Sequence, residues 1–338
     1  MVLMGLCLSM LINGMGVMEG QMLIFQGASD ASAAVAVGDD HIVVADDENN
    51  VLRCYETQGG LPIKQWRMDA FLGVNGNYPE VDIEGATRVG QRVYWISSHG
   101  RNKDGKLRKN RYRFFATRVL GQGSSVDLIA EGVVCRDLAR QFIKAPSLAS
   151  LHLEKTLQLD LGEVKSLAPK EEGLNIEGLA ASPDGQTLYI GFRNPRPNQQ
   201  ALVVPLENPA AVIDSGQAAV LGEPLLWDLD QLGIRGLEYV PQAGCFYVVA
   251  GPHQGKPGAR LYRWSGQRQD QPERIRSWQP FADDVSPEAL VVWPNKAEIL
   301  ILSDDGCRRI LVEGGWAENK TLTDLQRKTF RAQWWKAP

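Results

Sequence analysis

One pattern of polar and apolar positions recurs five times along the chain. Each copy starts with a polar residue, continues through an Ile-Glu-Gly-like triplet into an apolar strand, and returns through a turn as a second apolar strand that ends in a polar loop. The copies start at Asp30, Asp82, Asn175, Gly233 and Ser286. A further β-rich run follows each polar loop, at residues 51–55, 112–119, 201–205, 259–264 and 308–312. Four short strands per repeat, separated by Gly, Asp, Asn and Pro turns, are typical of β-propeller blades, whereas βαβ units would need helical crossovers.

The spacing of the copies predicts about five blades. The residue after the first apolar position of each copy is a convenient marker, and the five markers are Ser32, Glu84, Glu177, Arg235 and Glu288. Three of the four intervals agree, at 52, 58 and 53 residues, and the interval from Glu84 to Glu177 is 93 residues long. We therefore predict an all-β fold that forms a single β-propeller. A β-sandwich with accidental internal similarity is the alternative.

The long interval predicts a short helical insertion between blades 2 and 3. The excess lies at about residues 133–170, where residues 136–144 place Leu138 and Phe142 on one face of a helix that Pro146 ends. A degenerate sixth blade is the alternative interpretation of the same residues.

The two ends of the chain are expected to close the ring. The apolar run at residues 20–27 predicts a strand that pairs with the last blade, whose outer strand would come from residues 330–335. Such closure hides edge strands. We thus expect a propeller domain over residues 20–338, preceded by an apolar leader or upstream extension at residues 1–19.

The leader also bears on the compartment of the protein. Residues 1–17 carry no Lys or Arg and no clear signal-peptide cleavage site, and their apolar run is too short to span a membrane. We expect a cytoplasmic protein, with export as the alternative if these residues are a signal peptide.

Composition narrows the class of partner. With a formal net charge of −4, the chain lacks the strongly basic balance of a dedicated nucleic-acid binder, so any anion site must be local. Its five cysteines form no C-x-x-C pair, and Cys54, Cys245 and Cys307, which lie within or beside strand-like runs, are interpreted as small core residues. We expect a monomer that binds neither nucleic acid nor membrane, with a small anion as its candidate ligand.

Three stretches of the chain resemble a known family. They are the runs from Asp30 to Arg53, from Asp82 to Arg118 and from Asn175 to Pro197. They resemble a bacterial β-propeller family catalogued as domain of unknown function 3616, and the resemblance covers nearly the whole chain after Gly27. A more distant similarity, through the repeated Glu-Gly motif alone, links the chain to esterase-like domains related to calcium-dependent β-propeller phytases. Neither resemblance assigns a catalytic residue.

Up-and-down strand order places the markers and the polar loops at one mouth of the central channel. The loops contribute Asp46 and Asp47, His99 and Arg101, Arg193 and Asn194, His253, and Asp304 and Asp305. Because the ring brings the fifth blade beside the first, the two Asp pairs should meet. Adjacent carboxylates repel one another unless a cation neutralises them, and an all-oxygen set suits Ca²⁺ before Mg²⁺.

These residues predict a metal-assisted hydrolase of anionic esters, in particular phosphoesters. Asp46, Asp47, Asp304 and Asp305 would hold the metal. Glu84, Glu177 or His99 would be the general acid or base, and the substrate would contact Arg101, Arg193, Arg235, His253 and Glu288. No nucleophile elbow, P-loop or zinc-ligand spacing occurs in the sequence.

Plainer interpretations stand beside this one. The Glu residues can fasten blade to blade through backbone hydrogen bonds, and the Asp pairs can shape turns. The basic run from Arg101 to Arg113 predicts a long solvated hairpin around the Asp104-Gly105 turn. The alternative functions are a non-catalytic binding module for a small anion or peptide, and an interaction scaffold that uses Trp334 and Trp335.

Overall fold

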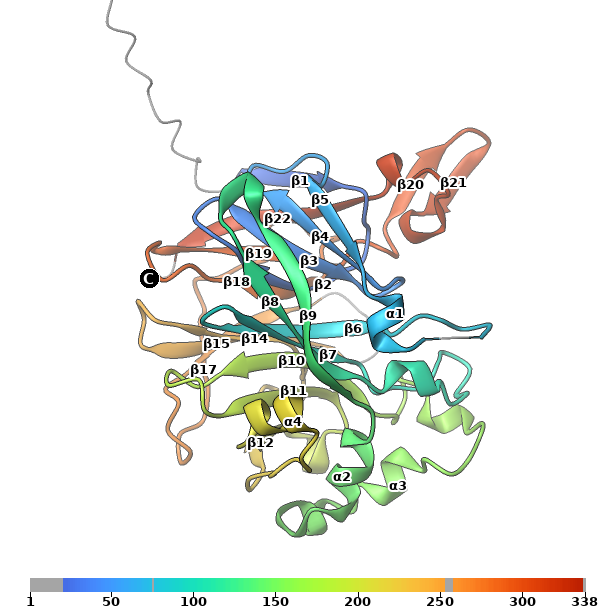
Figure 1. Cartoon of the computed structure of the whole chain (residues 1–338), viewed down its shortest axis with the longest axis vertical. Coiled ribbons are helices and arrows are strands. Elements are labelled where there is room, and N and C mark those ends of the chain that lie inside the picture. The colour runs from blue at the N-terminus through green and yellow to red at the C-terminus, as the bar shows by residue number, and fades with distance from the viewer. Residues whose placement is uncertain (1–20, 75, 253–257, 337–338) are drawn as a thin grey trace, which may run out of the picture.

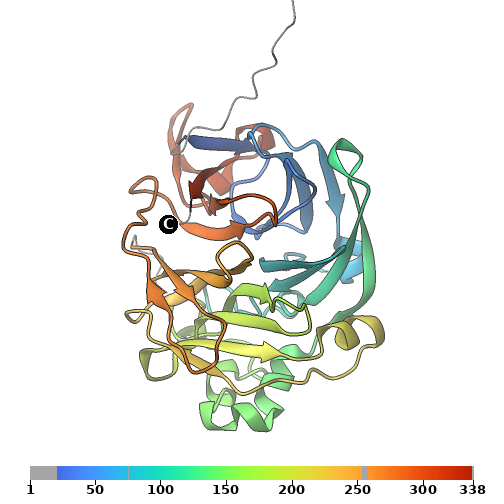
Figure 2. The same ribbon diagram turned by 90° about the vertical axis from the view of Figure 1, so that its left-hand side faces the viewer.

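The computed structural model describes residues 21–74, 76–252 and 258–336, and these residues form a five-bladed β-propeller. They contain five four-stranded antiparallel sheets and one separate two-stranded hairpin. Each innermost strand lies beside the innermost strands of two neighbouring blades, so the sheets follow one another around a closed ring (Figure 2). The predicted fold is confirmed, and the five-blade count replaces the six-blade alternative.

Each of the first four blades is built from consecutive strands, ordered from the channel outward. Blade 1 contains β2 (Ala31–Ala36), β3 (His41–Asp46), β4 (Val51–Glu56) and β5 (Lys64–Arg67), and blade 2 contains β6 (Ile83–Val89), β7 (Arg92–Ser97), β8 (Phe114–Leu120) and β9 (Asp127–Cys135). Blade 3 contains β10 (Asn175–Ala181), β11 (Leu188–Asn194), β12 (Ala201–Leu206) and β13 (Leu225–Trp227). Blade 4 contains β14 (Gly233–Val240), β15 (Cys245–Gly251), β16 (Arg260–Trp264) and β17 (Glu273–Arg274).

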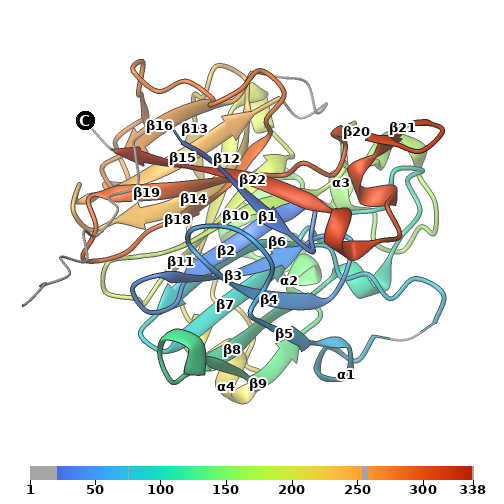
Figure 3. The ribbon, with the colours of Figure 1, turned by 90° about the horizontal axis from the view of Figure 1, so that it is seen from above.

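Blade 5 joins the two ends of the chain and closes the ring. Its order is β18 (Pro287–Val291), β19 (Glu298–Ser303), β22 (Thr329–Lys336) and β1 (Met22–Gln26). Strand β1 pairs with β22 from Met22 opposite Gln333 to Gln26 opposite Thr329, and Figure 3 shows the two strands side by side. The predicted partnership of the two end segments is therefore present, with β1 as the outermost strand instead of β22.

The run at 308–312 does not join blade 5 as expected. Residues Arg309–Val312 form β20, which pairs with β21 (Gly315–Glu318) in a hairpin that stands out from the ring (Figure 1). Strand β22 takes the place beside β19 instead. The reason is packing: β22 carries Phe330, Ala332 and Trp334 into the core, whereas Leu311 on β20 is 64% exposed.

The hydrophobic core lies between the blades. The described residues form five buried clusters, one at each interface between neighbouring blades, including the interface between blades 5 and 1. Inner strands such as β2 are consequently buried along their whole length, because a sheet packs against each of their faces. In the interface of blades 5 and 1, the rings of Phe25 and Phe330 stack at 4.7 Å, so closure of the ring is also an aromatic contact.

The helices are short and lie in the connections. The α-helices are α1 (Asp69–Leu72), α2 (Leu138–Lys144), α3 (Glu154–Leu157) and α4 (Pro209–Ser215). The 3-10 turns are η1 (Lys109–Arg111), η2 (Gly123–Ser125), η3 (Pro146–Leu151), η4 (Lys165–Leu167), η5 (Pro197–Gln199), η6 (Asn319–Thr321) and η7 (Leu325–Arg327). Within the described ranges, no helix has both the length and the apolar character needed to cross a membrane.

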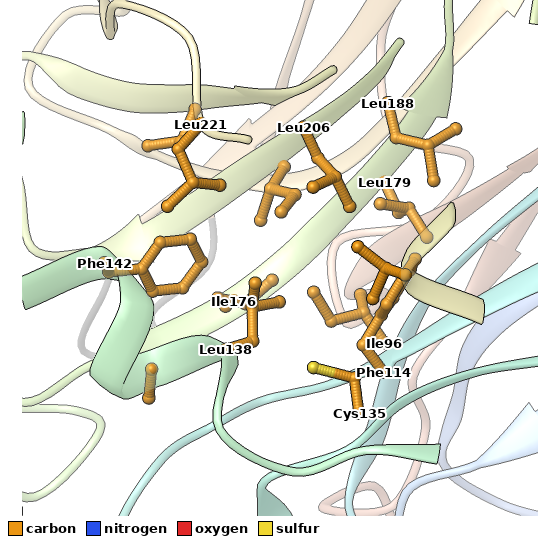
Figure 4. Close-up of a cluster of buried hydrophobic side chains, with 14 of the residues drawn as sticks. Ile96, Phe114, Cys135, Leu138, Phe142, Ile176, Leu179, Leu188, Leu206 and Leu221 are labelled. Carbon is orange, nitrogen blue, oxygen red and sulfur yellow. The ribbon is translucent and has the colours of Figure 1, made fainter. Parts of the chain in front are cut away.

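The predicted insertion is present between blades 2 and 3. It comprises α2, η3, α3 and η4, and α2 buries Leu138, Ala139 and Phe142. Figure 4 shows Leu138 and Phe142 in one cluster with side chains of blade 3 such as Ile176 and Leu206. The insertion is thus part of the interface between blades 2 and 3.

A bulge in every inner strand positions the functional residues. The register of β2, β6, β10, β14 and β18 with its neighbour shifts at the marker residue in each case. A bulge re-aims the side chain of its extra residue. Glycine follows the marker in blades 2, 3 and 4, and a Cβ on Gly236 would lie 1.8 Å from the carbonyl oxygen of Glu288. The Glu-Gly motif therefore combines a bulged polar residue with a close approach of the next blade.

This close approach makes a direct prediction for stability. We expect Gly236→Ala to lower the free energy of unfolding by about 3 kcal/mol or more, because the new methyl group meets a backbone carbonyl that cannot move alone. Gly162→Ala is the control, since a Cβ there meets nothing within 4 Å, and it should change stability by less than about 0.5 kcal/mol. Urea denaturation measures both. Equal stability of the two variants would contradict the packing argument.

Candidate functional site

The five inner strands enclose a small polar cavity at the centre of the ring. Ser32, Glu84, Glu177 and Glu288 line it, together with backbone neighbours of the fifth marker, Arg235. All five markers are buried, with 3–7% of their surface exposed. The alignment of the five repeats thus brings its markers to one place, and four of the five are charged.

Two acids and two arginines of this ring neutralise one another. Glu177 accepts a hydrogen bond from Arg193 at 2.7 Å and one from Asn175 at 2.6 Å, and its second oxygen lies 2.9 Å from Arg235 Nε. Arg235 also pairs with Glu288. The chain of charges crosses from blade 3 through blade 4 to blade 5, so it fastens three blades together. Buried ions need such partners because removal from water is costly.

A group of carboxylates lies at the junction of blades 5 and 1. Asp30, Asp46 and Asp47 each place a carboxylate oxygen within 4.8 Å of the others. The segment is fixed by backbone hydrogen bonds, from Asp47 N to Asp30 O and from Asp305 N to Ser29 O. The carboxylate of Asp30 also packs against Gly306, where a Cβ would overlap it.

A second group shares Asp47 with the first. Asp47, Asp82 and Glu84 likewise offer oxygens within 4.8 Å of one another. Asp82 is paired, because Ser98 Oγ donates to it and Arg111 Nη1 lies 2.9 Å from its Oδ2. The Oδ1 atom of Asp47 is buried without a hydrogen-bond partner. Among the described residues, neither a hydrogen bond nor an ion pair reaches the carboxylate of Glu84, which is only 7% exposed.

Burial and mutual repulsion make these carboxylates difficult to ionise. Burial, followed by repulsion from Asp304 and Asp46, raises the pKa of Asp30 to about 8. The pKa of Asp47 is raised well above its usual value by burial and by the charges of Asp30 and Glu84. Burial and the charge of Glu177 raise the pKa of Glu84 in the same way. A cation bound among these carboxylates would offset their mutual repulsion and would stabilise their charged forms despite burial.

The predicted metal ligands divide into two sets. Asp46 and Asp47 lie in the first carboxylate group, although Asp46 also shapes its turn by accepting hydrogen bonds from Ser29 N, Glu48 N and Asn49 Nδ2. Asp304 lies near enough to raise the pKa of Asp30 and Asp47. Asp305 is directed elsewhere: Arg331 binds both of its oxygens, at 2.7 and 2.8 Å.

Two of the other predicted residues, Arg101 and His99, do not meet the carboxylates. Arg101 donates to the carbonyls of Gly105, Gln158 and Leu161, so it holds the helical insertion and does not face the channel. His99 is fully buried, with its Nδ1 2.8 Å from the carbonyl oxygen of Ser97 and its ring edge-on to Tyr112. His253 lies outside the described residues.

Two further sequence expectations need correction. Residues 101–113 form no strand hairpin; after the Asp104-Gly105 turn, Lys106 bridges to Glu163 of the insertion. Trp334 is only 7% exposed and packs on Trp293 at 5.2 Å, and Trp335 packs on Tyr247. Both tryptophans therefore belong to blade interfaces and leave the scaffold hypothesis without its contact surface.

Sequence reasoning missed Asp30 and Asp82 as members of the carboxylate groups. Each is the polar residue that opens its repeat, two positions before the marker, where blades 3, 4 and 5 have Asn175, Gly233 and Ser286. The signal was therefore present in the alignment. The signal is an Asp at the opening position of blades 1 and 2, the two adjacent blades whose carboxylates lie beside Asp47.

Comparisons with known proteins found one matching family model and several similar solved structures. The family model described as protein of unknown function (DUF3616) matches residues 138–306. Among solved structures, the glutaminyl cyclase of Myxococcus xanthus has a TM-score of 0.44 and 11% identity, over 94% of this chain and 96% of that one. The PQQ-bound aldose sugar dehydrogenase of Streptomyces coelicolor has a TM-score of 0.41 and 12% identity, over 94% and 99%. No curated protein matches the chain.

The buried charge chain predicts a large effect of one isosteric change. Glu177→Gln leaves Arg193 and Arg235 with one carboxylate fewer in a site that excludes water, so we expect a loss of about 3–5 kcal/mol in unfolding free energy. Glu273→Gln breaks an exposed pair with Arg263 and should cost less than about 1 kcal/mol. Denaturation in urea compares them. A loss at Glu177 as small as that at Glu273 would contradict a structural role for the chain.

The surroundings of His99 predict how the protein responds to acid. Burial lowers the pKa of His99 to about 4, so the folded protein binds fewer protons than the unfolded chain between pH of about 6.5 and 4. The contribution of His99 to stability is therefore present above this range and lost as the pH falls through it. His99→Asn should reduce that part of the pH dependence in thermal denaturation. Ring protonation above pH of about 6, seen by NMR, would overturn this assignment.

Proposed function

The chain belongs to the DUF3616 family of proteins of unknown function, and we therefore propose a function from the site itself: the channel mouth binds Ca²⁺ and uses it to hydrolyse an anionic ester. One observation carries the metal part of this proposal. The carboxylate of Glu84 is buried beside Asp47 and Asp82 and has no hydrogen-bond or ion-pair partner among the described residues. An unpaired buried carboxylate is costly to ionise, so a cation held beside it would stabilise its charged form.

The chemistry of the ligands favours Ca²⁺. Both carboxylate groups offer oxygen only, and they come from loops and strand ends of blades 1 and 2. Ca²⁺ accepts six to eight oxygens in flexible geometry, whereas Mg²⁺ demands a near-octahedral set and retains its waters. Asp47 belongs to both groups, which supports a single ion bound close to Asp47. The remaining ligands of that ion would come either from the group that contains Asp30 or from the group that contains Glu84.

The catalytic part of the proposal assigns roles to the nearest side chains. A Ca²⁺ held by these carboxylates would supply a Lewis acid for the ester and for a bound water. In the arrangement in which Asp30 completes the ligands of the ion, Glu84 is the candidate general base, because burial and the charge of Glu177 raise its pKa and make it a better proton acceptor than an ordinary carboxylate. Arg193 and Arg235 lie in the same ring of residues and would orient an anionic group by exchanging part of their pairing with Glu177.

The pairing of the arginines also supports a second function. Both guanidinium groups are already matched with Glu177 and Glu288, so they are better placed to stabilise the ring than to attract a new anion. In the second candidate function, Ca²⁺ binds without catalysis and joins the loops of blades 5, 1 and 2. The two functions share the ion and differ in turnover.

Thermal denaturation with and without Ca²⁺ tests the metal site. After treatment with a chelator, added Ca²⁺ should raise the melting temperature of the parent, because a ligand of the folded state at 100 times its Kd contributes about 2.7 kcal/mol. Glu84→Gln should abolish the gain, and it should raise the melting temperature of the metal-free protein because one repulsive carboxylate is removed. Asp104→Asn, in an exposed turn, should keep the full gain.

The outcomes separate the alternatives. No gain in the parent, or an undiminished gain in Glu84→Gln, would rule out this metal site. A gain accompanied by Ca²⁺-dependent hydrolysis of 4-nitrophenyl phosphate supports the hydrolase. A gain without turnover of a panel of phosphate and carboxylate esters supports the binding function.

A further inference from the structure

A cavity outside the channel lies between blade 2 and the helical insertion. Its volume is about 330 Å³, which is within the lower range of small-molecule pockets. One wall comes from the segment that leads into β8, and the other comes from α2 and the residues after β9 and α3. Figure 1 shows α2 and α3 at the periphery of the ring, away from the inner strands.

The lining of this cavity combines positively charged and apolar side chains on both walls. Half of the lining residues carry a positive charge, and none carries a negative one: Lys109, Arg113, Arg136 and Arg140. The remaining lining residues are Leu107, Tyr112, Ala139 and Leu159. The chain as a whole has a net charge of −4, so this concentration of positive charge is a local feature.

Two of the arginines hold their positions without a carboxylate partner. Arg113 is 4% exposed and donates to the carbonyls of Leu72, Lys109 and Tyr112. Arg136 donates to the carbonyls of Val134 and Leu72. Neither guanidinium forms an ion pair with any of the described residues. The backbone carbonyls orient the guanidinium groups of Arg113 and Arg136, but, being neutral, they do not cancel the positive charges.

The two guanidinium groups meet at one atom. Arg113 Nε lies 3.0 Å and Arg136 Nη2 3.1 Å from the same carbonyl oxygen, that of Leu72. Burial and the neighbouring Arg136 lower the pKa of Arg113 to about 10, which reflects the cost of placing these charges together. An anion bound in the cavity would offset that cost.

We propose that this cavity is a binding site for a small phosphate monoester with an apolar group. Arg113, Arg136 and Lys109 bring the positive charge that a phosphate dianion needs to one cavity, and among the described residues the Nε of Arg136 has none of the hydrogen bonds that occupy the nitrogens of Arg113. The ring of Tyr112 and the side chains of Leu107 and Leu159 provide the surface for the apolar part. This site is separate from the carboxylate groups of the channel and rests on no part of the proposed metal chemistry.

Isothermal titration calorimetry with four probes tests the proposal on the full chain. Phenyl phosphate, inorganic phosphate, benzoate and phenol are titrated in the presence of a chelator, so that no metal at the channel mouth contributes. Phenyl phosphate should bind most tightly and inorganic phosphate more weakly, and phenol should show no binding. If phenyl phosphate does not bind, the site does not exist, and if benzoate binds more tightly, the phosphate assignment is wrong.

Matched variants locate the binding. Arg136→Gln should weaken phenyl phosphate by at least about tenfold, because a charge-assisted hydrogen bond is lost. Arg276→Gln removes an exposed arginine that does not line the cavity and should leave the affinity unchanged. Lys109→Gln, at an exposed position, provides a second variant that spares the hydrogen bonds made by both arginines. Equal binding by the parent, Arg136→Gln and Lys109→Gln would overturn the proposal.

Discussion

The close approach of the five inner strands around the channel determines the rest of the structure. At Gly178 and Gly236 a Cβ would collide with the neighbouring blade, and at Gly85 it would collide with Ile96 of its own blade and crowd Leu179 of the next, so glycine permits this spacing. The bulge just before each glycine turns the marker residue toward the channel, where little water reaches it. Charges in such a place must be paired or must recruit a partner. The Glu-Gly motif is therefore at once the reason for the tight ring and the reason for its polar centre.

The balance of charge within this ring locates its chemistry. In blades 3 to 5, acids and arginines alternate, and Glu177 and Glu288 are matched by Arg193 and Arg235. In blades 5, 1 and 2, the carboxylates outnumber their cationic partners: among the described residues Glu84 forms no ion pair, and Asp47 has a buried oxygen without a hydrogen-bond partner. One half of the ring is thus a structural clamp, and the other half retains capacity for a ligand.

Most of the fold could be predicted from the sequence because a propeller repeats a local pattern. The period of the inner and second strands, the insertion around Leu138 and Phe142, and the pairing of the two end segments all follow from that pattern. The third strand of blade 5 could not be predicted. The runs at β20 and β22 have similar short-range patterns, and their competition for β19 is decided by burial between two blades.

The site was predictable in position but not in detail. The loops and markers do converge, yet adjacent residues in an extended chain point in different directions: the charge of Asp304 acts on Asp30, whereas Asp305 binds Arg331. The direction of Arg101 depends on the insertion, which the repeat alignment treats as an addition. Long side chains near insertions are therefore the least predictable members of such a site.

The closure of blade 5 by the two ends of the chain delays the folding of this blade during synthesis. The partners Met22 and Gln333 are separated by more than 300 residues, so β1 must wait for nearly the whole chain before its place in the sheet exists. At roughly 5–20 residues per second, synthesis imposes a delay of about 15 to 60 s. During that interval the apolar segment MLIFQ can contact the segment at Gly60 but lacks β22, its partner in the sheet, so its free edge can pair with another chain until β22 has been synthesised.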